Sequence, residues 1–254
     1  MTGIEDILSA FTAITLNEMD RVKLMDRKDT KYVFREDTLP LVLHDLMTEY
    51  KVLAVNNARA PRYQTDYYDT PDFFHFQQHH SKHLNRYKVR TRRYLESNDT
   101  FFEIKFRNNH GRTVKQRILL QDGEEAINER MRIFLRRKSP VNDLSLEHKL
   151  RVRYRRITLV HYTLPERVTI DYDLHYSNEG GEHGYEKLII AEVKQERKAV
   201  SPFIRLMRTR RIREFRISKY CLGIMTLYGH VRHNLLKPKL RYLNRIIHAT
   251  DGHS

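Results

Sequence analysis

Hydrophobic and polar residues alternate along much of the chain between residues 27 and 196. Such alternation predicts β-strands, because successive strand side chains point to opposite faces. The expected strands cover residues 27–34, 51–55, 62–69, 85–94, 100–107, 112–120, 151–162, 166–176 and 187–196. The sequence Asn108-Asn109-His110-Gly111 between two of them predicts a hairpin turn. The pattern therefore predicts a large antiparallel sheet.

Hydrophobic residues at helical spacing occupy other parts of the chain and predict helices over 4–16, 37–50, 123–137, 201–211 and 218–228. Asp37 is expected to cap the second of these helices, with Pro40 in its first turn. Residues 229–254 are expected to form either a helix packed on the body or a loose basic tail. We therefore divide the chain into an N-terminal helix (1–19), one domain (20–228) and this C-terminal segment.

The polar faces of five strands are unusually rich in basic residues. Over residues 86–92 every second residue is Arg or Lys, whereas Tyr, Val and Thr stand between them. A face of this kind is often the solvated side of an antiparallel sheet. Because like charges on neighbouring strands repel each other, repetition on five strands favours convergence on a polyanion instead. The charged residues of these faces are Arg27, Asp29, Lys31, Arg86, Lys88, Arg90, Arg92, Glu103, Lys105, Arg107, Lys115, Arg117, Glu192, Lys194 and Glu196.

A closed barrel would turn these faces inward. About eight strands enclose a ligand-sized interior, and the predicted helices would cover the apolar outside. Unbalanced charge in such an interior is costly unless phosphate or water fills it. The expected fold is therefore α+β, with a closed antiparallel β-barrel that forms a tunnel and has flanking helices.

The composition supports an anionic ligand. The 254 residues include 47 Lys and Arg against 32 Asp and Glu, a formal net charge of +15. Such an excess attracts nucleic acid, anionic membranes or phosphates. Cys221 is the only cysteine, which excludes an intramolecular disulfide and fits a reducing, cytoplasmic location. The sequence has no run of roughly 18 apolar residues, so we expect no transmembrane segment. A partner protein could still attach the chain to a membrane.

Eight short motifs occur in an order that resembles the VTC domain, the polyphosphate polymerase domain of the vacuolar transporter chaperone complex. That domain is grouped with the CYTH-like triphosphate tunnel metalloenzymes. Each motif is common by itself, whereas their order over residues 20–228 is specific. The motifs are Arg27-Lys-Asp-Thr-Lys31-Tyr32, Tyr67-Tyr-Asp-Thr-Pro71, Lys88-Val-Arg90-Thr-Arg92, Phe102-Glu103-Ile-Lys105, Lys115-Gln-Arg117, Ile170-Asp171-Tyr, Glu192-Val-Lys194 and Ser218-Lys219-Tyr220.

The resemblance implies a tunnel in which basic side chains hold the triphosphate of ATP and a growing polyphosphate chain, with Mn²⁺ or Mg²⁺ bound by Glu192. Arg90, Arg92, Lys105 and Lys115 would be the catalytic residues. The resemblance also makes Arg156 a phosphate-binding residue. Alternation along the strand conflicts with this assignment, because Arg151, Arg153 and Arg155 share the face opposite to Arg156. The expected phosphate-binding residues are Lys31, Lys88, Arg117, Arg156, Lys194, Ser218 and Lys219.

Two further carboxylates stand among the basic motifs. Glu103 is expected to be the counter-ion that separates Lys105 from Arg107. Asp171 is expected near a strand end, where it could assist a second metal ion.

The expected reaction is transfer of the ATP γ-phosphoryl group to phosphate or polyphosphate. The ExExK motif of tunnel triphosphatases appears here as Arg27-x-Asp29-x-Lys31, and loss of an acidic group favours transfer over hydrolysis. A tunnel triphosphatase and a non-catalytic module that binds polyphosphate or RNA remain alternatives. Nucleic acid is not expected as the main ligand, because the aromatic residues lie largely on the strand faces opposite the basic residues.

Overall fold

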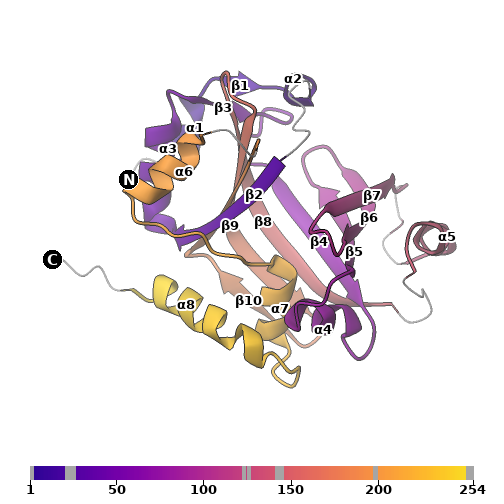
Figure 1. The fold of residues 1–254 in the computed structure, drawn as a ribbon. Coiled ribbons are helices and arrows are strands. Elements are labelled where there is room, and N and C mark those ends of the chain that lie inside the picture. Colours follow the sequence, from indigo (N-terminus) through magenta and orange to yellow (C-terminus); the bar gives the residue numbers. More distant parts are fainter. Residues whose placement is uncertain are drawn as a thin grey trace.

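A single strongly curved sheet forms most of the computed structural model, which describes residues 3–20, 27–121, 124, 127–140, 146–196 and 200–249 (Figure 1). The main path of the sheet has the order β2-β11-β9-β8-β4-β5-β6-β7, and its neighbouring strands are antiparallel. In that order the strands are β2 (Arg27–Arg35), β11 (Leu188–Glu196), β9 (Glu166–Asn178), β8 (Glu147–His161), β4 (Arg62–Asp69), β5 (Arg86–Tyr94), β6 (Asp99–Arg107) and β7 (Thr113–Leu119).

Each predicted strand is present, and three short strands flank the path. They are β1 (Ala13–Ile14), β3 (Tyr50–Leu53) and β10 (Gly181–Tyr185). The helix expected over 4–16 is shorter, because α1 (Ile4–Ser9) ends early and the chain enters β1, which pairs with β3 in parallel. The predicted hairpin turn joins β6 to β7, and Gly111 adopts a φ of 75°, which favours glycine.

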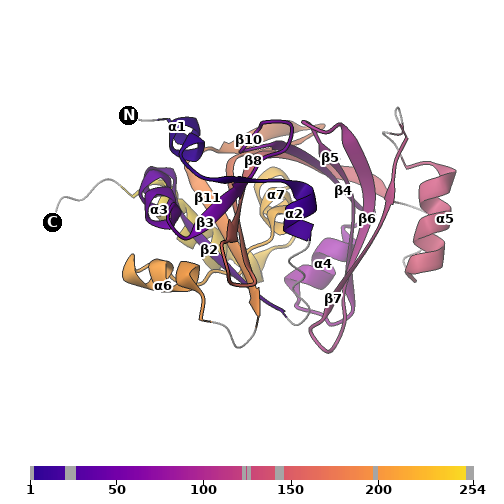
Figure 2. The ribbon, with the colours of Figure 1, turned by 90° about the horizontal axis from the view of Figure 1, so that it is seen from above.

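The expected closure of the barrel is not seen in the described part of the chain, where no pairing joins β2 to β7 at the two ends of the path. The sheet instead curls around an interior, as seen from above in Figure 2. Leu150 and Val152 of β8 and Leu174 of β9 make part of its inner face apolar. Helix α7 (Lys219–Leu227) packs against this area, and α4 (Phe74–His80) packs beside α7. These helices therefore fill part of the space that a closed barrel would surround.

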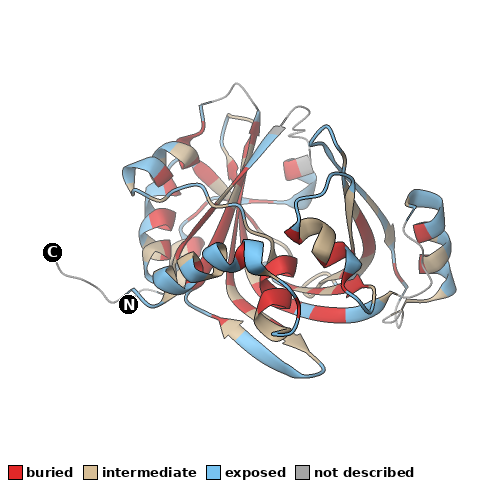
Figure 3. Ribbon diagram, turned by 60° about the horizontal axis from the view of Figure 1, so that its bottom comes forward, coloured by how far each residue is buried: buried red, intermediate tan, exposed pale blue. Residues whose placement is uncertain are grey.

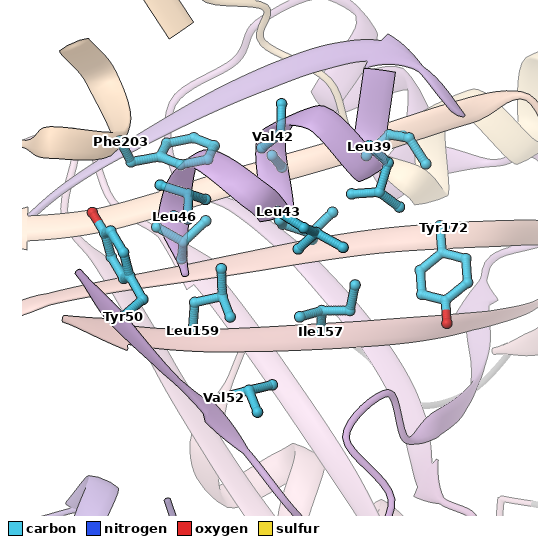
Figure 4. Packing of buried hydrophobic residues seen from close by; sticks show 14 of the residues in the cluster. Leu39, Val42, Leu43, Leu46, Tyr50, Val52, Ile157, Leu159, Tyr172 and Phe203 are labelled. Atoms are coloured by element: carbon cyan, nitrogen blue, oxygen red, sulfur yellow. The ribbon is translucent and has the colours of Figure 1, made fainter. Parts of the chain in front are cut away.

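Other helices cover the outer face of the sheet. On one side, α1, α3 (Leu39–Leu46) and α6 (Pro202–Thr209) pack over β2, β11, β9 and β8. Figure 4 shows Leu43 and Leu46 of α3 close to Ile157 and Leu159 of β8. On the other side, α5 (Glu129–Lys138) covers β5 and β6. The burial pattern in Figure 3 follows this arrangement, with buried positions along the sheet and exposed positions on the outer sides of the helices.

Helix α3 begins differently from the expectation. Asp37 lies in the short helix η1 (Glu36–Thr38) and pairs with Arg35 at 2.5 Å, whereas Thr38 is the N-cap residue of α3. Pro40 stands in the first turn, as predicted. Helix α2 (Leu16–Asp20) is an additional element that the hydrophobic pattern did not separate from α1.

The C-terminal segment is a packed helix over most of its described length. It contains η3 (Asn234–Leu236) and α8 (Lys237–Ile247), in which Leu243 is fully buried. Tyr242 of α8 stacks on Phe215 with ring centroids 4.8 Å apart. The alternative of a loose basic tail is therefore wrong for these residues. None of the described helices is both long enough and apolar enough to cross a membrane.

Candidate functional site

The predicted basic residues converge on the inner face of the curved sheet. Val89 of β5 packs into the outer core beneath α5, so the alternate residues Lys88, Arg90 and Arg92 point to the interior. The same alternation applies to the other strands. The inner-face residues of the predicted set are Lys31 of β2, Lys88, Arg90 and Arg92 of β5, Lys105 of β6, Lys115 and Arg117 of β7, Arg156 of β8, and Glu192 and Lys194 of β11.

Contacts between distant elements show that these side chains meet in space. Lys88 Nζ on β5 donates a hydrogen bond to Ser218 Oγ at the N-cap of α7, at 2.7 Å. Lys105 on β6 is near enough to Glu192 of β11 and Lys31 of β2 for their charges to shift its pKa, although neither of these described residues forms a hydrogen bond or an ion pair with it. The two ends of the sheet therefore contribute to one charged interior.

Glu103 is the fully buried counter-ion of two predicted catalytic residues. Its Oε2 accepts hydrogen bonds from Arg90 at 2.6 and 2.8 Å, and its Oε1 lies 3.1 Å from Lys115 Nζ. The expected pairing with Lys105 and Arg107 is wrong, because Arg90 is the direct cross-strand neighbour of Glu103 and such neighbours are closer than residues two apart. Burial would raise the pKa of Glu103, but these cations outweigh it and lower the pKa to about 2.

Asp171 is the counter-ion of a second cluster. Arg156 binds its two carboxylate oxygens at 2.6 and 2.8 Å, and Lys219 Nζ binds it as well. Burial would raise the pKa of Asp171, but the charges of Arg156 and Lys219 hold it well below its usual range. Arg156 shares the inner face with Val152 and Tyr154, whereas Arg153 is exposed on the outer face. The structure therefore places Arg156, and not its outward neighbours, in the charged interior.

Glu192 is the third interior carboxylate. Its Oε2 lies 3.2 Å from Lys31 Nζ, and its side chain is 17% exposed. Burial would raise the pKa of Glu192, but the charges of Lys31, Lys194 and Lys105 together lower it well below its usual range. Glu192 is therefore an ionised carboxylate at neutral pH.

Three half-buried interior cations, Lys88, Arg92 and Lys105, form no ion pair with a carboxylate of the described residues, although the charge of Glu192 reaches Lys105 and that of Glu103 reaches Arg92. Arg92 Nε donates only a long 3.4 Å hydrogen bond to the Thr65 hydroxyl. Burial lowers the pKa of Lys105 to about 7, and the charges of Arg90 and Lys88 add to this effect while Glu192 opposes it. This accumulation of uncompensated positive charge is unfavourable without an anion.

Tyrosine rings line the interior beneath these cations, so the expected separation of aromatic and basic faces is wrong here. Arg90 lies over Tyr67, Arg92 over Tyr63, and Arg156 over both Tyr63 and Tyr154. The three rings are at most 7% exposed. They support the cations from below and offer little surface for stacking a nucleobase.

Sequence reasoning did not select these tyrosines as site residues. Tyr63, Thr65 and Tyr67 share one face of β4, so their alternation was a usable signal. Tyr67 also belongs to one of the motifs quoted above, and its hydroxyl accepts a 3.4 Å hydrogen bond from Arg90.

The remaining predicted residues lie at the margins of the site. Arg117 is exposed on β7, where it packs over the Phe101 ring at 4.2 Å. Lys194 contributes to the field at Glu192. Ser218 caps α7 by accepting a hydrogen bond from Cys221 N at 3.3 Å, so the N-terminus of that helix faces Lys88. A helix N-terminus favours anions, which agrees with the surrounding charge.

The interior suits a divalent ion only if the substrate supplies ligands. In the described ranges no three His, Cys, Asp or Glu side chains form a group that could hold a metal ion. Mg²⁺ is commonly bound through one or two carboxylates together with substrate phosphates. Glu192 fits that mode, because Glu103 and Asp171 are each engaged by two cations.

The sequence matches the model of the VTC domain over residues 26–228, which is most of the chain. The chain belongs to the VTC domain family. No curated protein matches the sequence. The region of the match includes every residue of the three clusters just described.

Two solved structures are similar to this VTC domain at low sequence identity. A candidate adenylate cyclase from Bacillus halodurans is 16% identical with a TM-score of 0.51, over 80% of this chain and all of that chain. A Hippeastrum candidate adenylyl cyclase with a dominant triphosphatase activity is 12% identical with a TM-score of 0.49, over 82% of this chain and 100% of that chain. The first likeness shows that the two chains share a fold.

Proposed function

We propose that this VTC domain is a polyphosphate polymerase, which transfers the γ-phosphoryl group of ATP to phosphate or to a growing polyphosphate chain. The observation that carries the proposal is the set of interior cations that form no ion pair with a carboxylate of the described residues, Lys88, Arg92 and Lys105, beside the ionised Glu192. Phosphoryl transfer requires mainly positioning and neutralisation of charge, which such a set supplies.

In the proposed reaction, an oxygen of the acceptor phosphate attacks the γ-phosphorus of ATP. The bond from that phosphorus to the bridging oxygen breaks, and ADP leaves with the electron pair. Arg92 and Arg90 would bind the transferred group, because a guanidinium binds phosphate oxygens in pairs. Lys88, Lys105 and Lys115 would hold the chain as point charges. A bound Mn²⁺ or Mg²⁺, held by Glu192 and phosphate oxygens, would supply further neutralisation of phosphate charge.

The three interior carboxylates are poorly suited to activate water, which is one argument for transfer to phosphate over hydrolysis. Activation of water calls for a general base, and the pKa values of Glu103, Asp171 and Glu192 are all lowered by neighbouring cations. A carboxylate with such a pKa is a weak base near neutrality. An acceptor phosphate is already ionised and needs no base.

The test is incubation of the purified protein with ATP and Mn²⁺, with polyphosphate and ADP measured separately. We expect polyphosphate to form, and Arg92→Ala and Glu192→Gln each to slow synthesis by about a hundredfold. Arg92 is preferable to Arg90 for this test, since removal of Arg90 would leave Glu103 partly unpaired. Arg153→Ala, on the exposed outer face of β8, is the matched control and should retain activity.

The products separate this function from its alternatives. ADP and free phosphate in equal amounts, without polyphosphate, would identify a triphosphatase. Binding of polyphosphate without ADP release would identify a non-catalytic module.

A further inference from the structure

A second basic pocket lies outside the curved sheet, on the outer face of β2. It has a volume of about 490 Å³, and it is lined by β2, by α6 and by the segment that follows α6. Volumes of this order are typical of small-ligand sites. We propose that this pocket is a separate binding site for a multiply charged phosphate anion, such as a short inorganic polyphosphate.

Four cations line the pocket: Lys28, Arg208, Arg211 and Arg213. All four are exposed, and none of them forms a hydrogen bond or an ion pair through its side chain with any residue of the described ranges. One carboxylate, Glu214, also lines the pocket, and it lies 3.4 Å from Arg216 Nε. Positive charge therefore exceeds negative charge in the pocket, which suits an anion with more than one charge.

The floor of the pocket contains an unsatisfied polar group. Thr30 is 3% exposed, and its hydroxyl has no hydrogen-bond partner among the described residues. A buried hydroxyl without a partner is uncommon, because it forfeits the hydrogen bonds that it makes in water. Tyr32 lies beside it, and burial raises the pKa of Tyr32, so this hydroxyl remains a donor near neutral pH.

The lining of the pocket favours phosphate over other anions. Arginine binds phosphate oxygens through two parallel N–H groups, and three of the four cations are arginine. Tyr32 is the only aromatic residue of the lining and is 4% exposed, so no ring is available to stack on a nucleobase. Because the pocket is hollow, a small anion can enter it, whereas a flat membrane surface cannot.

The location links the pocket to the charged interior. Alternation on β2 turns Lys28, Thr30 and Tyr32 outward and Lys31 inward. The segment that lines the pocket continues along β2, where Phe215 N donates to Lys31 O at 2.7 Å, and then reaches Lys219. The pocket therefore lies on the outer side of the strand that supplies Lys31 to the interior.

The test uses tripolyphosphate without metal, at constant ionic strength, with two readouts. Calorimetry measures affinity and the number of sites, and mass spectrometry measures protection of Lys28 from acetylation, with the exposed Lys138 of α5 as reference. We expect two sites and protection of Lys28 in the wild type. The interior variant Arg92→Ala should weaken one site only and leave Lys28 protected.

The double variant Arg208→Ala/Arg213→Ala should weaken the outer site by roughly tenfold or more and abolish protection of Lys28, because two charge-assisted contacts are lost. The matched control Arg205→Ala/Arg245→Ala removes the same charge at exposed positions of α6 and α8 that do not line the pocket, and should behave as wild type. Lys28→Gln provides a second, single-residue test by calorimetry.

Three results would overturn the proposal: one site in the wild type, equal losses in the pocket and control variants, or stronger protection of Lys28 by anionic vesicles or RNA than by tripolyphosphate. The outcome is independent of catalysis. A protein without polymerase activity can still bind at the outer pocket, and an active enzyme can lack that site.

Discussion

At the scale of single residues, the main feature is an excess of positive over negative side chains in the interior. Glu103 and Asp171 each neutralise two cations, whereas Lys88, Arg92 and Lys105 form no ion pair with a carboxylate in the described chain. Evolution of a purely structural interior would favour pairing or apolar replacement, since unpaired buried charge is destabilising. An anionic substrate would neutralise this excess.

Lys105 should make phosphate binding depend on pH. Its pKa of about 7 means that it loses its proton as the pH rises through 7, and a bound phosphate raises that pKa again. Arginine keeps its charge over this range, so Lys105→Arg is the reference. We expect the affinity of the wild type for tripolyphosphate, divided by that of Lys105→Arg, to fall between pH 7 and 8.5 by up to tenfold per pH unit. Calorimetry on both proteins removes the ionisation of the ligand from the comparison. A constant ratio would show that Lys105 does not bind the ligand.

Glu103→Gln should destabilise the protein and make it dependent on anions. The substitution keeps the volume but leaves Arg90 and Lys115 without their counter-ion, at a cost of about 3 kcal/mol. Urea unfolding at pH 7 measures this loss, and tripolyphosphate should restore part of it. Because the pKa of Glu103 is lowered to about 2, its contribution is present above pH 4.5 and is lost as the pH falls toward 2. The variant should lack that portion of the acid dependence.

At the scale of secondary-structure elements, the position of α7 is decisive. The helix carries Lys219 in its first turn and has Ser218 as its N-cap, and both contact residues of the sheet interior. Its close approach to β8 and β9 requires Gly223. A Cβ atom there would lie 2.5 Å from Leu150 Cδ2 and 2.6 Å from Tyr176 Cδ1.

Gly223→Ala should therefore displace α7 and weaken phosphate binding together with stability. Overpacking of this kind costs about 1–3 kcal/mol, measured as a lower urea midpoint. The affinity for tripolyphosphate should fall as well, because Lys219 moves with the helix. Gly229→Ala is the matched control, since a Cβ at Gly229 meets no atom within 4 Å. Normal tripolyphosphate binding by a destabilised Gly223→Ala protein would show that the position of α7 does not affect the binding site.

At the scale of the whole molecule, the curved sheet brings residues from both of its ends around one interior. The formal net charge of +15 then acts against the compact state through self-repulsion. A ligand that neutralises the interior should offset part of this repulsion. The open arrangement between β2 and β7 also leaves the β2 edge available to the segment that lines the outer pocket.

Tripolyphosphate should raise the melting temperature in a concentration-dependent manner. A ligand that binds only the folded state adds about 2.7 kcal/mol at one hundred times its Kd, which corresponds to roughly 5–10 °C for a protein of this size. Scanning fluorimetry measures the shift, and Arg92→Ala should reduce it. An equal shift with sulfate at the same ionic strength would contradict a specific polyphosphate site.

Much of the fold and of the interior site follows from local patterns in the sequence. The strand alternation places Lys31, Lys88, Arg90 and Lys105 on one face, because the side-chain period of a strand is two and does not depend on tertiary context. The order of the motifs predicts membership of the VTC domain family, which the match over residues 26–228 confirms. Strand parity alone could not decide between Arg156 and its neighbours, since both faces of β8 carry arginine.

Tertiary structure alone decided which charges pair and what fills the interior. Glu103 pairs across strands with Arg90, and Asp171 pairs with Arg156 and Lys219, because sheet register and the docking of α7 set those distances. Helix α7 docks on an apolar inner surface around Leu150. In the described residues, the two end strands of the sheet path, β2 and β7, do not pair with each other. Local sequence determined which face each side chain occupies, whereas contacts between residues distant in the chain depended on how the sheet curves.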